Sequence, residues 1–444
     1  MILDVIAAER IKQEELPMKE EKVKTQEYDI LVLGDGIEYS SDCSRTNCNN
    51  NVVVIGGTGS GKTFSVVLKR LIQTQNSNLI VATVKDRLYD ITAYGLTQRG
   101  YKVEKLDFVH PKKSTVYYNP FDMFRSWEGI TQFCSDVVYS NKHRENSSDP
   151  YWNECAVSLL AAIVGYNKCT KANADMGDVI KMFNSLKIIS SQSDGGIKTT
   201  LDEQFCELKK QAGSEHYITR MWNTIANLPM NTLNCVISSL STTLDKTFSS
   251  EVLENFTPDN NKGKFDIDDF VENKTILFIN SSPYNLNTKY LLNILYASMF
   301  QNLFEIAEKN NGSLRHDVQV IFDDFAAGGA GGINGFEEYI STFRQAGLSV
   351  MLLLQSQSQL EQIYGRAGAV SILDNCDTTV FMGSNSYSSA KHMAERISRP
   401  VEEVLYMENG KEIVFRRGEK PKYYVDRYPI LKDPVYIEWA RQGR

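Results

Sequence analysis

A glycine-rich segment near the start of the chain has the residue types and spacing that bind phosphate. Gly56-Gly-Thr-Gly-Ser-Gly-Lys-Thr63 matches the pattern G-x-x-x-x-G-K-[ST], in which glycines allow backbone N–H groups to close around phosphate oxygens. We expect Lys62 to reach the β- and γ-phosphates of ATP and Thr63 to hold Mg²⁺. The predicted nucleotide-binding residues are Gly57, Thr58, Gly59, Ser60, Gly61, Lys62 and Thr63.

Two carboxylates follow an apolar run much later in the chain. Val318–Phe322 predicts a buried strand, and it ends in Asp323 and Asp324. A phosphate site of this type needs an acid at the end of another core strand, so we expect Asp323 to bind Mg²⁺ through water. Asp324 is the candidate that polarises the attacking water. The alternative interpretation is a strand that ends in a solvated acidic turn.

Two polar residues beside the next apolar run are further candidates for catalysis. Gln355 directly follows Ser349–Leu354, where its amide can sense the γ-phosphate or position water, although it also fits a hydrogen-bonded strand cap. Arg344 lies just before the same run and is a candidate arginine finger that reaches a neighbouring subunit's nucleotide. A surface arginine on a helix is the alternative for Arg344.

The segments that must position these residues alternate between short apolar runs and helical spacing. The glycine-rich segment follows one such run and opens a predicted helix over 63–73, which is the context that phosphate binding requires rather than an incidental turn. The alternation indicates an α/β fold, with a mostly parallel sheet covered on both faces. The predicted strands are 51–55, 79–83, 102–107, 275–279, 318–322, 349–354 and 378–382.

The character of the chain changes after Asn119-Pro-Phe121, where helical patterns replace the apolar runs until about residue 257. One helical face is marked by Ala156, Leu159, Leu160, Ile163 and Val164. We therefore predict a helical insertion inside one α/β domain. The predicted divisions are a charged leader over 1–27, the first part of the nucleotide-binding domain over 28–123, an all-α inserted domain over 124–262, and the second part over 263–444.

Composition limits the classes of protein to which the chain can belong. It has 444 residues, 42% of them hydrophobic, and a formal net charge of −7, so it is globular and is not a protein that coats nucleic acid through bulk positive charge. The longest mainly apolar stretch, 155–166, is shorter than the roughly 20 residues of a membrane-spanning helix. We expect this chain to be soluble, with reduced cysteines and no zinc site.

Longer motifs occur around these candidates in a fixed order. They are NNNVVVIGGTGSGKT, GYKVEKLDF with YYNPFDMF, YWNECAVSLLAAIVGY, FDIDDFVENKTILFINSS, VIFDDFA, FRQAGLSVMLLLQSQSQLEQIYG and ILDNCDTTVFMGS. Together they resemble the TraG-like coupling proteins of conjugative type IV secretion, over roughly residues 28–425. The closing pair, LLLQSQSQLEQIYG and NCDTTVFMG, separates this family best from other P-loop motors.

The resemblance implies a RecA-like P-loop fold with an all-α domain inserted between the two ATP motifs. It implies a ring hexamer at the cytoplasmic face of the bacterial inner membrane, which hydrolyses ATP and binds DNA without strong sequence preference. Its partners would be a relaxase, the DNA strand that the relaxase carries, and the secretion channel. By position, Lys62 and Thr63 match the P-loop pair, Asp323 and Asp324 match the second ATP motif, Gln355 matches the sensor and Arg344 matches the finger.

The sequence departs from the family pattern at three places. Asp323-Asp324 stands where the family usually has Asp-Glu, which moves the second carboxylate about one methylene from the water. Thr83-Val-Lys-Asp-Arg87 replaces the usual Asp-Pro-Lys-Gly-Glu, and many members carry N-terminal transmembrane helices, whereas we expect none within this sequence. These departures keep an alternative open, a weakly or non-hydrolysing adaptor that docks secretion substrates. Another ring motor of the FtsK or HerA type is a further alternative, although those motors lack the helical block.

The sequence gives less information about DNA contacts. Residues 411–427 combine basic side chains with tyrosines, a pattern that suits single strands through charge and stacking. Its alternation also predicts a solvated β-hairpin, which is the interpretation we favour. The glycine-rich segment Gly328–Gly335 is either a mobile loop that lines a DNA channel or an ordinary surface loop.

Overall fold

The computed structural model describes residues 28–84, 86–139, 150–191, 197–258, 261–282, 284–325 and 332–442. These residues form two compact units. The helical unit is Tyr117–Lys264, and the sheet unit consists of the described residues of Lys24–Val116 and Phe265–Arg444. The predicted leader and residues 328–331 of the glycine-rich segment lie outside the described residues.

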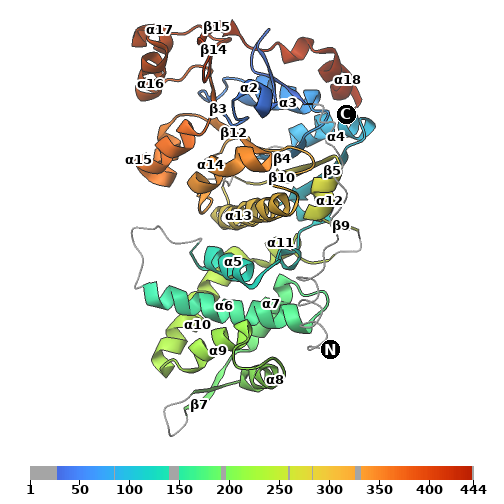
Figure 1. Ribbon diagram of the computed structural model, residues 1–444, viewed down its shortest axis with the longest axis vertical. Helices are drawn as coiled ribbons and strands as arrows, with labels where there is room; N and C mark the ends of the chain where they lie inside the picture. The colour runs from blue at the N-terminus through green and yellow to red at the C-terminus, as the bar shows by residue number, and fades with distance from the viewer. Residues whose placement is uncertain are drawn as a thin grey trace. The chain divides into compact units, whose positions relative to one another are not determined.

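A nine-stranded sheet runs through the described part of the sheet unit, in the order β15-β14-β13-β3-β12-β11-β4-β10-β5 (Figure 1). Neighbouring strands are parallel except at β13–β14 and β14–β15, which are antiparallel. The predicted α/β fold with a mostly parallel sheet is therefore confirmed. The strands are β3 Val52–Ile55, β4 Asn78–Thr83, β5 Lys102–Asp107, β10 Thr275–Asn280, β11 Val318–Phe322, β12 Leu348–Leu354, β13 Thr378–Phe381, β14 Lys411–Arg416 and β15 Lys422–Asp426.

Helices cover both faces of this sheet, as its continuous apolar strands require. On one face, side chains of α3, α4 and α18 form a core cluster with strand residues such as Val54 and Met351. On the other face, Tyr296 of α13 and Phe336 of α14 both make edge contacts with Phe322 of β11. The helices are α3 Leu68–Gln73, α4 Arg87–Gln98, α18 Pro434–Gln442, α13 Leu286–Lys309 and α14 Phe336–Ala346.

Helices α4 and α18 approach closely enough to require a glycine. A Cβ atom added at Gly95 of α4 would lie 1.9 Å from the Trp439 ring of α18. Trp439 is buried, and the Arg99 guanidinium lies over its ring at 4.7 Å. The close contact fixes the C-terminal helix on the sheet through packing rather than through strand pairing.

The sheet unit also contains further strands and helices. The segment 40–51 contains one helical turn, because Asp42 accepts hydrogen bonds from the backbone N–H groups of Ser44 and Arg45. The other elements are β1 Ile30–Val32, β2 Glu38–Ser40, α2 Cys43–Thr46, α12 Ile267–Glu272, α15 Ser358–Asp374, α16 Tyr387–Ile397 and α17 Val401–Leu405.

The helical unit is built around α6 Pro150–Thr170, which contacts α5, α7, α9 and α10. The predicted apolar face of α6 is buried, and Leu159, Ala161 and Ala162 are each 0% exposed, so the middle of the helix is covered all round. A short antiparallel hairpin of β7 Ile188–Ser191 and β8 Ile197–Thr199 accompanies the helices. The remaining helices are α5 Trp127–Tyr139, α7 Met176–Ser185, α8 Asp202–Ala212, α9 Tyr217–Ala226, α10 Met230–Thr247 and α11 Ser250–Leu253.

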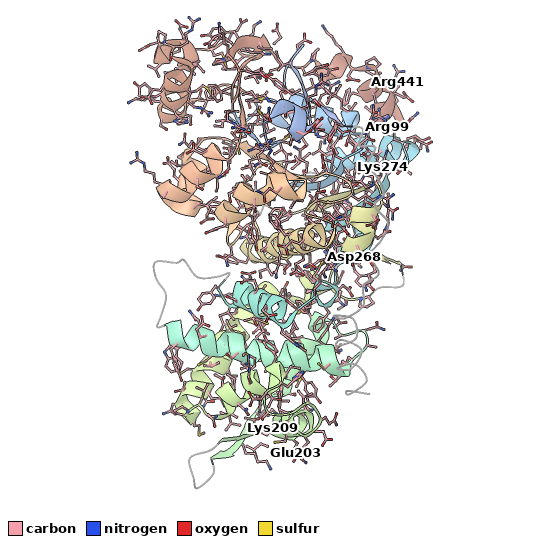
Figure 2. The ribbon with its side chains drawn as sticks, viewed as in Figure 1. Arg99, Glu203, Lys209, Asp268, Lys274 and Arg441 are labelled. Atoms are coloured by element: carbon pink, nitrogen blue, oxygen red, sulfur yellow. The ribbon has the colours of Figure 1, made fainter. Side chains whose placement is uncertain are left out.

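Charged side chains lie over the outside of both units (Figure 2). Glu203 and Lys209 are exposed on α8, and Arg99 and Arg441 are exposed in the sheet unit. Within the part of the chain that the structure describes, none of the helices has the length and apolar character needed to cross a membrane.

Candidate functional site

The glycine-rich segment lies at the carboxyl end of β3, in the middle of the sheet. All four residues of β3 are buried, and the strand pairs with β12 and β13. The backbone N–H of Gly56 donates to Leu354 O, and that of Gly57 donates to Gly383 O, so both neighbouring strands fix the base of the loop. Gly59 and Gly61 have φ angles of 77° and 86°, which glycine adopts without a steric cost.

The loop leads into a helix, as predicted, but its first turn differs from an α-helix. Thr63–Val67 forms a π-helical turn, and α3 continues from Leu68 to Gln73. The first backbone N–H groups of a helix have no acceptor within the helix, and the helix dipole favours negative charge at that end. The local geometry therefore suits a bound phosphate group.

The Lys62 side chain folds back over the loop that precedes it. Its ammonium group donates to the backbone oxygens of Gly56 and Gly57. Burial lowers the pKa of Lys62; nearby Asp324 and Asp323 raise it, and nearby Arg427 lowers it. The ammonium thus lies within electrostatic range of two carboxylates and a guanidinium, and a phosphate could replace the carbonyl oxygens that it now contacts.

Thr63 and Asp323 meet across the carboxyl edge of the sheet. Thr63 Oγ1 donates a hydrogen bond of 2.7 Å to Asp323 Oδ1. Asp323 is 4% exposed, and its backbone N–H donates to Ala82 O of β4. A hydroxyl and a carboxylate oxygen are ligands that Mg²⁺ accepts directly or through water. The two predicted metal ligands are therefore in contact.

Asp324 lies beside this pair in an unusual backbone conformation. Its φ angle is 70°, in the left-handed region, which costs a residue with a side chain roughly 1 kcal/mol. Its Oδ1 is buried and has no hydrogen-bond partner among the described residues. Local strain and a buried acceptor without a partner are typical of functional positions.

Gln355 is close to the glycine-rich loop, whereas Arg344 is not. Thr58 Oγ1 donates a long, 3.4 Å hydrogen bond to Gln355 Oε1, and the Gln355 backbone N–H donates to Gln359 Oε1. Arg344 lies in the last turn of α14 and donates to Cys43 O at 3.0 Å. Because β12 runs between Arg344 and Gln355, the two are separated by about 20 Å along the strand. Arg344 therefore lies near the amino ends of the parallel strands, whereas the glycine-rich loop of its own chain lies at their carboxyl ends.

Arg427 is a residue of this site that sequence analysis missed. It follows β15, and its guanidinium donates to Ser60 O of the glycine-rich loop at 2.6 Å and to Met382 O at 2.8 Å. The sequence offered no signal for this contact beyond a basic residue in the 411–427 segment. The contact depends on how the β14–β15 hairpin pairs with the rest of the sheet.

The 411–427 segment forms the favoured hairpin, and the description of it as solvated is wrong for β14, whereas β15 is half-buried to exposed. Most of β14 is buried, because β14 pairs with β13 and extends the main sheet. Tyr423 donates to Ile397 O, and Tyr424 donates to a carboxylate oxygen of Glu403. These tyrosine hydroxyls contact α16 and α17, so the hairpin has a structural role.

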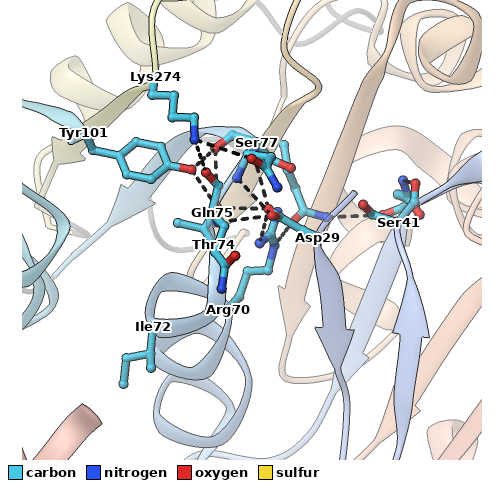
Figure 3. Close-up of polar contacts among 12 residues, drawn as sticks. Asp29, Ser41, Arg70, Ile72, Thr74, Gln75, Ser77, Tyr101 and Lys274 are labelled. Carbon is cyan, nitrogen blue, oxygen red and sulfur yellow. Dashed lines mark hydrogen bonds and ion pairs between the residues drawn. The ribbon is translucent and has the colours of Figure 1, made fainter. Parts of the chain in front are cut away.

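Sequence analysis also missed a second polar cluster, which lies near the amino ends of the parallel strands (Figure 3). Asp29 is 3% exposed and accepts hydrogen bonds from Arg70, Thr74 and the backbone N–H groups of Gln75, Asn76 and Ser77. Burial raises the pKa of Asp29, but Arg70 and these hydrogen bonds outweigh burial and lower it overall. The cluster fixes the chain entering β1 to the end of α3.

The sequence matches the model of a protein family described as Type IV secretory system Conjugative DNA transfer, over residues 2–401. It is 24% identical over 304 residues to the type IV secretion system-coupling protein VirD4 of Bartonella henselae, covering 68% of this chain and 45% of that protein. Protein VirD4 of Agrobacterium fabrum is 22% identical over 421 residues, covering 84% of this chain and 59% of that protein. The chain thus spans about half the length of these curated relatives.

Solved structures share the fold. The bacterial conjugative coupling protein TrwBdeltaN70 has a TM-score of 0.62 at 15% identity, covering 91% of this chain and 92% of that chain. TrwB in complex with ADP and Mg²⁺ has a TM-score of 0.61 at 16% identity, covering 91% and 93%. VirB4 of Thermoanaerobacter pseudethanolicus has a TM-score of 0.52 at 12% identity, covering 93% and 99%.

Proposed function

The chain belongs to the type IV secretory system conjugative DNA transfer family, and from this premise we propose that it is an ATP-driven DNA-translocating coupling protein. It links a relaxase–DNA substrate to a type IV secretion channel in conjugation. The proposal depends on one observation. Lys62, Thr63, Asp323 and Asp324 lie close together at the carboxyl ends of the parallel strands. This set contains a cation for phosphate, two oxygen ligands for a metal and a carboxylate for water.

The residues present fit ATP and Mg²⁺. The loop glycines leave room, since Cβ atoms added at Gly57 and Gly59 would meet no atom within 4 Å. Thr63 and Asp323 would hold Mg²⁺ by hydroxyl and carboxylate oxygens. TrwB structures carry ADP with Mg²⁺ and an ATP analogue, which supports the same ligands here. Mg²⁺ would supply neutralisation of charge that develops on the phosphates.

Each residue then has a defined role in hydrolysis. Lys62 exchanges its carbonyl contacts for phosphate oxygens and stabilises negative charge on them. Asp324 directs its buried oxygen without a partner toward the attacking water and accepts its proton or orients it. Gln355, beside Thr58 of the loop, senses the γ-phosphate or positions the water.

The proposed function requires several copies of the chain. We infer a homo-hexamer on DNA, on the cytoplasmic side of the bacterial inner membrane, with the helical unit as an insertion in the nucleotide-binding domain. Arg344 then acts as an arginine finger on the nucleotide of a neighbouring subunit, which agrees with its place far from the loop of its own chain. The DNA is single-stranded or is bound without sequence preference.

The test is ATP turnover by purified protein with and without single-stranded DNA, for wild type and Lys62→Ala. We expect turnover that rises with DNA and falls to background in Lys62→Ala. The matched control is Lys112→Ala, which removes an exposed lysine distant in sequence from the loop. Turnover insensitive to DNA, or a Lys62→Ala protein as active as wild type, would overturn the proposal.

A second candidate function follows from Asp324. Its short carboxylate, in a strained backbone position, also fits a protein in which nucleotide binding controls assembly and hydrolysis is weak or absent. Such a protein would act as an adaptor that docks secretion substrates. Tight binding of ATP without DNA-stimulated turnover distinguishes this adaptor from the motor.

A further inference from the structure

Arg427 supports the glycine-rich loop from the C-terminal hairpin. One nitrogen of its guanidinium donates to Ser60 O at 2.6 Å, and the other donates to Met382 O at 2.8 Å and Lys411 O at 3.3 Å. One side chain therefore joins the loop to the segments that follow β13 and begin β14. Charge-assisted hydrogen bonds of this length are stronger than those between neutral groups.

The bond to Ser60 fixes the orientation of one peptide unit in the loop. In a planar trans peptide, the C=O and the following N–H point in opposite directions. With Ser60 O directed at Arg427, the N–H of Gly61 points away from Arg427. Gly61, with a φ angle of 86°, permits this orientation at low steric cost. The guanidinium thus holds an N–H donor of the loop in a fixed direction.

Arg427 also adds positive charge behind the loop. Its charge is close enough to Lys62 to lower the pKa of the Lys62 ammonium. The nearby acid, Glu412, is 1% exposed, and burial raises its pKa to about 8, which reduces the negative charge that it carries near pH 7. Glu412 therefore offsets the guanidinium charge only in part, and this charge favours an anion at the loop.

We propose that Arg427 is a positioning residue for nucleotide phosphate, which orients the Ser60–Gly61 peptide so that the Gly61 N–H faces the bound phosphate. The inference rests on the proposed nucleotide-binding function. It assigns the C-terminal hairpin a role in forming the nucleotide site, in place of the DNA contact that its basic residues suggested. Displacing the hairpin would release the Ser60 carbonyl and weaken phosphate binding.

The same hairpin contains a matched control. Arg417, in the turn after β14, donates to Asn47 O at 2.7 Å and pairs with Asp377. It joins the hairpin to the loop that precedes β3, whereas Arg427 joins it to the loop that follows β3. Each arginine thus attaches the hairpin to the sheet through a backbone carbonyl, and one of them contacts the phosphate loop.

The experiment measures the dissociation constant of a fluorescent Mg·ADP analogue for wild type, Arg427→Gln, Arg427→Lys and Arg417→Gln, alongside thermal unfolding. We expect Arg427→Gln to weaken binding by roughly tenfold or more, since the loop loses a charge and a fixed donor. Arg427→Lys should recover part of this loss, because an ammonium can still donate to Ser60 O. Arg417→Gln should bind like wild type even if its melting temperature falls.

The outcomes separate this inference from the proposed function. Wild-type protein that binds no Mg·ADP analogue would overturn the proposed function and the inference with it. Wild-type protein that binds, with Arg427→Gln binding equally well, would overturn the inference alone. So would equal losses in Arg427→Gln and Arg417→Gln, since they would reflect hairpin stability. If Arg427→Gln fails to fold, Arg427→Lys decides. Weaker binding than wild type by a folded Arg427→Lys protein would support the inference, and wild-type affinity would overturn it.

Discussion

The Thr63 hydroxyl donates a 2.7 Å hydrogen bond to Asp323 Oδ1, although 260 positions separate the two residues in sequence. Thr63 begins the helix after β3, and Asp323 directly follows β11, with β12 between the two strands. Parallel strands end at one edge, so this contact brings both proposed Mg²⁺ ligands together. The pair is already in position to share a cation.

Removing either proposed metal ligand should reduce Mg²⁺-dependent chemistry. We expect Thr63→Ala and Asp323→Asn each to reduce ATP turnover by roughly 10²-fold or more and to weaken Mg·ADP binding. Thr97→Ala, which removes an exposed hydroxyl from α4, is the control and should leave both unchanged. Titration of turnover against Mg²⁺ checks the prediction. Wild-type Mg²⁺ dependence in both site variants would show that the two residues do not hold the metal.

Asp324 should affect hydrolysis and leave binding intact. Asp324→Asn removes the proposed base and should lower turnover by roughly 10²- to 10⁴-fold with nearly unchanged ADP affinity. Asp324→Glu extends the carboxylate toward the water and should retain or increase turnover. Single-turnover hydrolysis and ADP binding, measured on the same preparations, separate the two effects. A fully active Asp324→Asn protein would contradict the role.

Subunit mixing tests Arg344. Arg344 lies at the other end of the parallel strands from the glycine-rich loop of its own chain. We therefore expect Arg344→Ala to bind nucleotide normally and to lose roughly 10³-fold in turnover. Mixed with Lys62→Ala protein, it should recover part of the activity, since intact fingers of one variant then reach intact loops of the other. Arg315→Ala, which removes another exposed arginine, should remain active without mixing. A mixture with no more activity than its components would argue against a finger in a neighbouring subunit.

Asp29 should contribute stability that depends on pH. Its folded-state pKa lies below the ordinary value of 3.8, so its contribution is complete above about pH 4 and is lost as pH falls through the folded-state pKa. We expect Asp29→Asn to destabilise the protein at pH 7 by on the order of 3 kcal/mol, because the buried Arg70 guanidinium loses the negative charge of its carboxylate partner. Denaturant unfolding at several pH values measures this. The difference from wild type should shrink below pH 4, and an exposed-site control, Asp90→Asn, should show no such trend.

The parts of the fold that were predictable depend on local patterns. Buried parallel strands are continuous apolar runs, so β3, β11 and β12 could be located from sequence. The phosphate motif and the acids after β11 then followed, because parallel strands end at one edge. The π-helical turn after Lys62 had no local signal, since its residues also fit an α-helix.

The parts that were not predictable depend on contacts between distant segments. Arg427 reaches Ser60 because of the pairing of β14 and β15, which includes a register shift between Glu412 and Val414. A residue count along the chain does not reveal such a shift. The five residues that donate to Asp29 also follow from how α3 ends beside β1, which involves no motif. Tertiary packing therefore decided both features.

The central claim, that ATP hydrolysis drives DNA through this protein, is tested most directly by displacement of streptavidin from the end of a biotinylated single-stranded DNA. Purified protein, ATP and Mg²⁺ are added, and release of the DNA from streptavidin is followed with time. We expect release that requires ATP hydrolysis, is absent in Lys62→Ala and is retained in Lys112→Ala. ATP hydrolysis by wild type without any release, or equal release by Lys62→Ala, would contradict the claim.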